Sequence, residues 1–126
     1  MTGSEHTIEE EEPAAFSLYI NSIAAGDQIC DRYMPLSAEN LYERLSDGVV
    51  LTRLINNVKA NTIDERRLNK QATMSVYQRN ENLNEVIRAA RVIGCVVVNI
   101  GAEDIAKQKC VLQLLIHFFI SIHVDL

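Results

Sequence analysis

The sequence predicts an all-α fold in one compact domain. Three observations predict this class: the chain has 126 residues, of which 48% are hydrophobic, apolar residues recur at helical spacing, and no two strand-like runs are available to pair. A chain of this size buries roughly two-thirds of the surface that its unfolded form exposes, so its core can form without disulfides or metals. Only 5 Gly and 2 Pro residues also exclude a collagenous or disordered chain.

The first predicted helix begins at Pro13 and ends at Gly26 and Asp27. Its inward stripe follows the i, i+3, i+4, i+7 spacing of an amphipathic helix and consists of Phe16, Tyr19, Ile20, Ile23 and Ala24. A shorter helix is predicted from an N-cap at Ser37. Its inward residues are Ala38, Leu41, Tyr42 and Leu45.

Three further helix starts are predicted from capping residues. Ser46 and Asp47 are predicted to be the cap and the first turn of a helix whose core face is Leu51, Leu54, Ile55 and Val58. Two capping boxes follow, Thr62 to Glu65 and Ser75 to Gln78. The second box heads a longer helix that Gly94 is placed to end, and its inward residues are Leu83, Val86, Ile87 and Ala90.

The last predicted helix, residues 110–124, is unusual because it contains no Asp, Glu, Lys or Arg. An extended connector at residues 95–98 and a turn at residues 101–104 precede it. Spanning a bilayer takes about 20 apolar residues, so this shorter run is not predicted to be a membrane anchor. A helix that is apolar nearly all round is either central in its own domain or a surface for docking another protein.

The formal net charge of −5 belongs to the first twelve residues, which contain five glutamates and no lysine or arginine. We expect residues 1–12 to be an acidic, disordered lead-in and residues 13–126 to form the domain. From Pro13 onward, acidic and basic residues are equal in number. A polyanion-binding domain carries a large positive excess, so neither a nucleic acid nor a membrane is expected as partner.

Motifs for catalysis, metals or cofactors are absent from the sequence. His6, His117 and His123 lack metal-ligand spacing, and there is no phosphate-binding loop or nucleophile elbow. We therefore expect no enzyme activity and no cofactor. The odd set Cys30, Cys95 and Cys110, with no apolar leader before a cleavage site, is typical of reduced thiols in a soluble cytoplasmic protein.

Several motifs in order along the chain resemble one known family. They include Asp47-Gly48-Val49-Val50-Leu51, Thr62-Ile63-Asp64-Glu65-Arg66 and Val98-Asn99-Ile100-Gly101-Ala102-Glu103-Asp104. Similar segments lie at residues 16–21, 55–57, 68–70, 81–84, 93–95 and 111–115. The chain resembles a calponin-homology domain and, within that family, the first such domain of the fimbrin/plastin group of actin-bundling proteins.

The resemblance implies four main helices with shorter connecting ones, and non-enzymatic binding of filamentous actin in the actin cytoskeleton. It also implies a second calponin-homology domain in the same parent chain. The family's contact segments are the first and last helices, with the turn before the last. Carried over to this sequence, the candidate actin-binding residues are Phe16, Tyr19, Ile20, Ile23, Lys107, Lys109, Leu112, Gln113, Ile116, His117 and Ile120.

Three positions depart from the family pattern. Tyr19 and Ile116 stand where the family usually has Trp, and Ile120 stands where it usually has Lys. The loss of that lysine removes a charge that could meet an acidic partner, while Ile keeps the apolar patch. The alternative hypothesis is a scaffold domain whose apolar last helix packs on a neighbouring domain or on a partner other than actin.

Overall fold

The computed structural model describes the backbone of residues 2–93 and the side chains of residues 13–93. Within these residues every regular element is helical, which confirms the all-α prediction. The α-helices are α1 (Thr2–Ala24), α2 (Leu41–Leu45), α3 (Val49–Val58) and α4 (Val76–Val92). Two short 3-10 helices join them, η1 (Asp31–Tyr33) and η2 (Glu65–Arg67).

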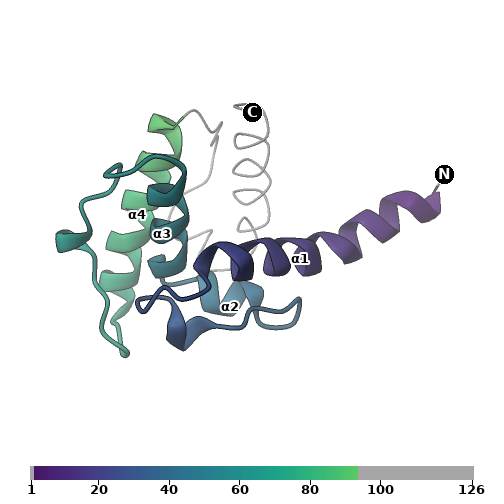
Figure 1. The fold of residues 1–126 in the computed structure, drawn as a ribbon, viewed down its shortest axis with the longest axis horizontal. Coiled ribbons are helices and arrows are strands. Elements are labelled where there is room, and N and C mark those ends of the chain that lie inside the picture. Colours follow the sequence, from purple (N-terminus) through teal and green to yellow (C-terminus); the bar gives the residue numbers. More distant parts are fainter. Residues whose placement is uncertain (1, 94–126) are drawn as a thin grey trace.

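Helix α3 lies at the centre of the described residues and contacts α1, α2 and α4. In Figure 1, α3 and α4 run side by side, α1 crosses beside α3, and the N-terminal half of α1 projects away from the other helices. Six of the ten α3 residues are buried, among them Leu51, Leu54 and Ile55 of its predicted core face. The fourth predicted residue, Val58, is only half-buried at the end of the helix.

The contact between α3 and α4 depends on a glycine. Gly48, directly before α3, has φ +83°, and a Cβ atom at that position would lie 2.8 Å from the Cβ of Asn82 on α4. A residue with a side chain would therefore have to adopt a left-handed conformation and also displace a buried neighbour. Gly48 lets the start of α3 approach the middle of α4 closely.

Three asparagine side chains join helices to connecting segments in the same way. Each amide both donates to a backbone carbonyl and accepts from the N–H of the same residue, so it satisfies two backbone groups that would otherwise lack partners. The pairs are Asn21 with Leu36 (2.9 and 2.8 Å), Asn56 with Ile63 (3.0 and 2.9 Å), and Asn82 with Asn69 (2.9 and 2.9 Å). Asn82 also donates to the Asp47 carbonyl at 2.9 Å, so it links α4 to both segments that flank α3.

The predicted inward residues of α4 are confirmed. Leu83, Val86, Ile87 and Ala90 are all buried, and Ser75 caps the helix with the predicted capping box. The Ser75 hydroxyl accepts from Gln78 N at 3.1 Å, and the Gln78 side chain accepts from Ser75 N at 3.0 Å. Helix α4 ends at Val92, with Ile93 as its C-cap, so the predicted stop at Gly94 lies outside the described residues.

The other capping box, predicted at Thr62, is wrong. Thr62 donates to the Lys59 carbonyl at 2.6 Å, and Asp64 caps the short helix η2 by accepting from Arg66 N at 3.1 Å. The Glu65 carboxylate, which the box would require at the helix start, instead accepts from Arg53 and Asn56 on α3. These contacts with α3 compete successfully against a local capping interaction.

Three other helix starts also differ from the sequence predictions. Helix α3 begins at Val49 with Gly48 as its N-cap, whereas Ser46 is the C-cap of α2 and its hydroxyl donates to the Glu43 carbonyl at 2.6 Å. Helix α1 begins at Thr2 and has Pro13 inside it, so the helix runs through the segment predicted to be a disordered lead-in. Acidic residues are favourable near the positive end of a helix dipole, which is compatible with a start in this acidic segment. Helix α2 begins at Leu41 because Ser37 and Asn40 form reciprocal side-chain hydrogen bonds in a turn before it.

No helix within residues 2–93 is both long and apolar enough to cross a membrane. The predicted connector, turn and last helix of residues 95–124 lie outside the described residues.

Candidate functional site

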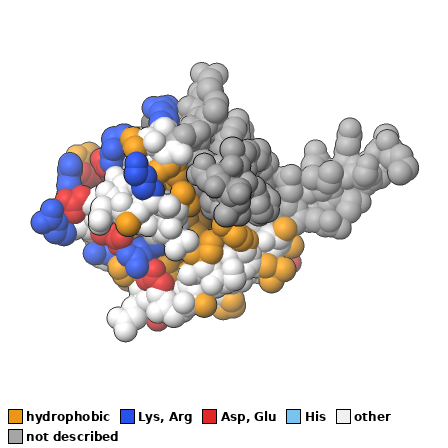
Figure 2. Space-filling view, turned by 45° about the horizontal axis from the view of Figure 1, so that its top comes forward, with side chains coloured by type: hydrophobic (Ala, Val, Ile, Leu, Met, Phe, Trp, Pro, Cys, Tyr) orange, Lys and Arg blue, Asp and Glu red, His pale blue; other side chains and the backbone are white. Residues whose placement is uncertain are grey.

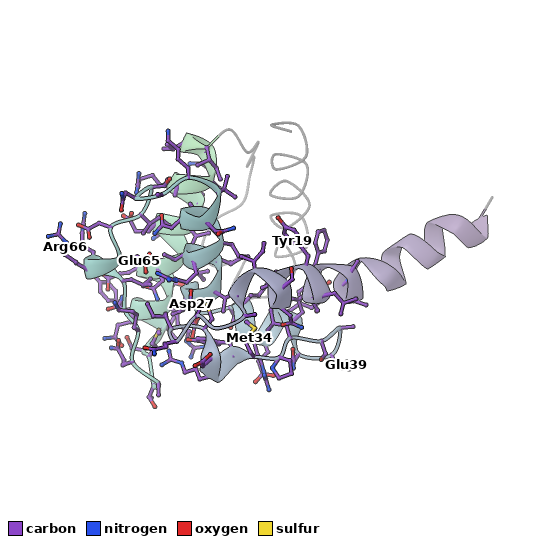
Figure 3. All side chains as sticks on the ribbon, in the orientation of Figure 1. Tyr19, Asp27, Met34, Glu39, Glu65 and Arg66 are labelled. Carbon is purple, nitrogen blue, oxygen red and sulfur yellow. The ribbon has the colours of Figure 1, made fainter. Side chains whose placement is uncertain are left out.

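The four candidate binding residues on α1 divide into two inward and two partly exposed side chains. Phe16 and Ile20 belong to the core and are only 7% and 1% exposed. Tyr19 and Ile23 are half-buried and pack against the edge of that core. Figure 3 shows Tyr19 on the side of α1 opposite Met34 and Glu39. Only Tyr19 and Ile23 therefore offer appreciable surface to a partner.

The outward side of α1 carries a residue that the sequence analysis missed. Leu18 is 72% exposed. It lies two positions from Phe16 and so falls off the inward stripe of the helix. An apolar side chain outside the stripe is the sequence signal that could have revealed it.

The exposed surface around Leu18 is uncharged over the C-terminal half of α1. No Asp, Glu, Lys or Arg occurs between Pro13 and Gly26. We call this surface the uncharged α1 face; its exposed or half-exposed residues are Ala14, Ala15, Leu18, Tyr19, Ser22, Ile23 and Ala25. The Ser22 hydroxyl donates to the Tyr19 carbonyl at 2.7 Å, so it is already satisfied within the helix. A helix surface without charges is suited to contact with another protein.

Charged side chains are concentrated elsewhere on the molecule. On the face shown in Figure 2, Lys, Arg, Asp and Glu gather mainly on the left, the side of η2 and α4 in Figure 1, whereas hydrophobic side chains lie mainly toward the side of α1. The described residues on this face therefore separate a charged region from an apolar one.

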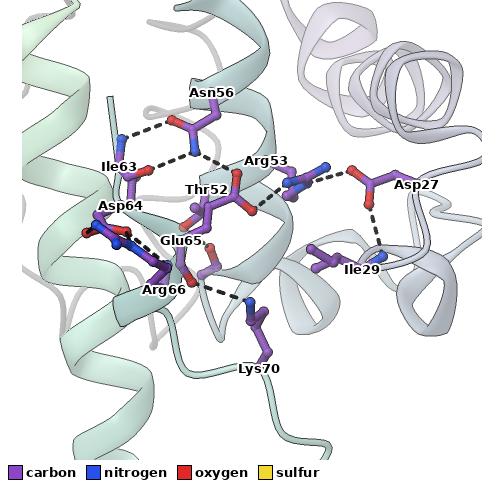
Figure 4. A network of polar contacts seen from close by, with 11 residues as sticks. Asp27, Ile29, Thr52, Arg53, Asn56, Ile63, Asp64, Glu65, Arg66 and Lys70 are labelled. Carbon is purple, nitrogen blue, oxygen red and sulfur yellow. Dashed lines mark hydrogen bonds and ion pairs between the residues drawn. The ribbon is translucent and has the colours of Figure 1, made fainter. Parts of the chain in front are cut away.

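An ionic cluster anchors the C-terminal end of α1 to α3. Arg53 on α3 donates through Nε to Asp27 at 2.6 Å and through Nη1 to Glu65 of η2 (Figure 4). Asn56 donates to the second oxygen of Glu65 at 2.8 Å. We call Asp27, Arg53, Asn56 and Glu65 the Arg53 cluster.

The carboxylates of the Arg53 cluster stabilise the charged guanidinium of Arg53. Burial disfavours the charge of Arg53, but hydrogen bonds and attraction from Asp27 and Glu65 outweigh that effect and raise the pKa of Arg53. Asp27 also accepts from Ile29 N at 2.9 Å, which orders the turn after α1. The cluster and the Asn21–Leu36 pair together set the position of α1 and hence of its uncharged face.

The thiol of Cys30, which lines the same pocket as this cluster, is not arranged for catalysis. Cys30 is fully buried and free of a disulfide, as the sequence predicts. Burial, with a smaller contribution from the negative charge of Asp27, raises the pKa of Cys30 to about 12, so the nucleophilic thiolate is scarce at neutral pH. Among residues 13–93, no group of three His, Cys, Asp or Glu side chains could hold a metal ion.

Seven of the candidate binding residues lie outside the described residues. They are Lys107, Lys109, Leu112, Gln113, Ile116, His117 and Ile120. Cys95 and Cys110 also lie there. The part of the candidate site that the structure describes is therefore the uncharged α1 face.

Comparison with known proteins gives consistent matches. The chain is 45% identical to fimbrin of Saccharomyces cerevisiae over 113 residues, and 38% identical to plastin-1 of Homo sapiens over 109 residues. These alignments cover 86% and 85% of this chain but only 18% and 17% of those proteins. The chain thus spans less than a fifth of the length of these curated relatives.

A solved structure agrees with these matches. The crystal structure of the actin-crosslinking core of Schizosaccharomyces pombe fimbrin superposes with a TM-score of 0.83 at 35% identity, covering 89% of this chain and 25% of that one. The family model of the calponin homology (CH) domain matches residues 10–122. Since that match includes nearly the whole sequence, the chain belongs to the calponin homology domain family.

Proposed function

We propose that this chain is a filamentous-actin-binding module of a longer actin-bundling protein. The observation that carries the proposal is the uncharged α1 face, which exposes Leu18 and part of Tyr19 and Ile23 on a helix that the resemblance assigns to actin contact. Similarity to fimbrins and plastins, and to a structure described as an actin-crosslinking core, supports the filament as the partner. The same similarity disfavours a scaffold domain that never contacts actin.

Within this proposal the candidate residues have different roles. Tyr19 and Ile23 contact the filament together with Leu18, whereas Phe16 and Ile20 support the helix from the core. Lys107, Lys109, Leu112, Gln113, Ile116, His117 and Ile120 supply the second contact segment. The module acts by binding alone and has no enzymatic role.

The proposal also extends to the parent protein. We expect a second CH domain in the same parent chain, because the matched relatives are several times longer than this module. We expect the protein to act in the cytoplasm, at the actin cytoskeleton. These expectations rest on the similarity to fimbrins and plastins.

Co-sedimentation with actin filaments tests the proposed face. Leu18→Glu places a charge in the middle of the uncharged α1 face, and we expect it to weaken binding about tenfold, because an apolar contact is lost and a carboxylate is desolvated. Tyr77→Glu on α4 is the matched control, since Tyr77 is 73% exposed and Leu18 is 72% exposed. Both variants introduce the same charge on a helix surface.

The outcomes distinguish a loss of binding at the uncharged α1 face from a loss of folding. We expect Tyr77→Glu to bind like the wild type and both variants to keep the wild-type circular dichroism spectrum. Equal binding by Leu18→Glu and Tyr77→Glu would show that the α1 face does not contact the filament. A wild-type chain that does not pellet with filaments at any concentration would contradict the proposed function itself.

A further inference from the structure

A pocket of about 260 Å³ lies where the C-terminal ends of α1 and α3 meet η2. Its walls include Ile23, Asp27, Arg53, Asn57, Asn61 and Glu65. A water molecule takes up about 30 Å³ in the liquid, so the pocket has room for an ammonium or guanidinium group with part of its side-chain stem.

The charges on the pocket walls do not balance. Among the wall residues within residues 13–93, Asp27 and Glu65 are acidic and Arg53 is the one basic residue. Lys59 and Lys70 lie nearby in sequence but do not line the pocket. The described part of the walls therefore carries one net negative charge.

Two helix ends add to this negative potential. Helix α1 ends at Ala24 and α3 ends at Val58, and residues from the last turns of both helices line the pocket. The C-terminal end of a helix carries a partial negative charge of about half an elementary charge. Both helix ends thus favour a cation in the pocket.

The acidic side chains retain capacity for a further donor. Asp27 is 18% exposed and Glu65 is 25% exposed although both contact Arg53. An ionised carboxylate offers about four acceptor positions, of which the hydrogen bonds from Arg53, Ile29 and Asn56 use only some. Cys30, which also lines the pocket, has its pKa raised by burial first and then by Asp27, an effect in the direction that a negative environment requires.

The pocket is continuous with the uncharged α1 face, because Ile23 belongs to both. We propose that the pocket accepts a lysine or arginine side chain of the filament subunit that covers the uncharged α1 face. This inference rests on the proposed function and adds to it a charged contact at the edge of an apolar one. Such a contact sets the register of the two surfaces.

A charge placed at the mouth of the pocket tests the inference. Asn57 is exposed on the last turn of α3, where a cation is compatible with the helix dipole. We expect Asn57→Lys to weaken co-sedimentation with actin filaments about threefold to tenfold, because the new cation competes with the incoming one. Asn84→Lys, at an exposed position on α4, is the charge control, and Asn57→Met is the control for size.

The test compares how strongly each of these variants binds actin filaments. The inference is supported when Asn57→Lys weakens binding more than both Asn84→Lys and Asn57→Met. Equal weakening by Asn57→Lys and Asn84→Lys would mean that only net charge matters, and equal weakening by Asn57→Lys and Asn57→Met would mean that bulk matters. Either result overturns the inference while leaving the α1 face unaffected.

A measurement without actin distinguishes failure of the pocket from failure of the proposed function. Ethylguanidinium chloride is titrated to millimolar concentration into the isotope-labelled chain and followed by NMR. Sodium chloride at equal ionic strength is the control titration. We expect the amide NMR chemical shifts of Asn57, Asn61 and Glu65 to change in the wild type. We expect no such changes in Asn57→Lys. If those changes are absent in the wild type, the pocket does not accept a cation, whatever the filament experiment shows.

Discussion

The outer faces of α1 and α4 differ although both helices bury an apolar stripe. Helix α4 exposes Arg79, Glu81 and Arg88, and Arg88 forms an ion pair with Glu85 at 2.8 Å. The outer face of α1 after Pro13 has no charge at all. Folding requires the inner stripes, so the composition of the outer faces is free to serve another purpose.

Exposure of a single apolar residue does not separate the two helices. Val76, Tyr77 and Val92 on α4 are between 57% and 73% exposed, against 72% for Leu18 on α1, and isolated apolar residues on a protein surface are common. The difference is that α4 surrounds them with charged residues and α1 does not. The absence of charge over a whole face, rather than one exposed leucine, indicates a docking surface.

The largest expected effect on stability concerns the buried contact of α4. Gly48→Ala combines a left-handed backbone conformation with a Cβ atom 2.8 Å from Asn82. We expect urea denaturation to show a loss of about 3 kcal/mol in the free energy of unfolding, since strain and overpacking contribute about 1–3 kcal/mol each.

Gly26→Ala, after the end of α1, is the matched control for this variant. Gly26 has φ +80°, but a Cβ atom there would meet nothing within 4 Å. The variant should therefore lose only the strain contribution, about 1 kcal/mol. Equal losses at Gly26 and Gly48 would refute the close approach of α3 and α4 as the cause.

The next effect concerns the attachment of α1. Arg53→Met leaves the carboxylates of Asp27 and Glu65 without their shared cation, and we expect a loss of about 1–2 kcal/mol by chemical denaturation because these groups are only partly exposed. Glu65→Gln should then cost less in the Arg53→Met background than in the wild type. Additive losses in this double-mutant cycle would mean that Arg53 and Glu65 do not stabilise each other.

A smaller effect is expected at the N-terminus of α4. Ser75→Ala removes a confirmed cap and should lower the free energy of unfolding by about 1 kcal/mol in thermal or urea denaturation. Thr62→Ala is the matched control, because the Thr62 hydroxyl only donates to the Lys59 carbonyl and should cost about half as much or less. If Thr62→Ala lowered the free energy of unfolding more than Ser75→Ala, Thr62 would act as a helix cap, contrary to the structure.

The smallest effects on stability are expected at the two outer faces. Leu18→Ser and Tyr77→Ser should each change the free energy of unfolding by about 0.5 kcal/mol or less, because both side chains are mostly exposed. Melting temperatures of the two variants should thus agree with that of the wild type. A marked loss in Leu18→Ser alone would indicate that the α1 face is already packed within the chain.

The sequence predicted the inner faces of the helices well. Leu83, Val86, Ile87 and Ala90 on α4, and Leu51, Leu54 and Ile55 on α3, are buried as their spacing requires. The contact residues of the candidate site are harder to predict from spacing. Phe16 and Ile20, which the resemblance places among the contact residues, are buried, whereas Leu18, the most exposed large apolar residue among residues 13–24 of α1, was not among the candidates.

The difference between the two capping boxes shows why sequence spacing alone does not predict every contact. Ser75 and Gln78 form their box because both partners come from the same turn of chain. Thr62 and Glu65 have the same spacing, but Arg53 and Asn56 on α3 compete for the Glu65 carboxylate. A local pattern cannot include a competitor that is distant in the sequence.

The sequence by itself determined the helical class, the inner stripe of each helix and the uncharged stretch of α1, because each depends only on residue type and spacing. The tertiary structure decided which polar groups pair, as in the Arg53 cluster and the contact of Gly48 with Asn82. It also decided which part of the uncharged stretch faces outward. Those outcomes depend on which segments meet in space, and helical periodicity carries no information about that.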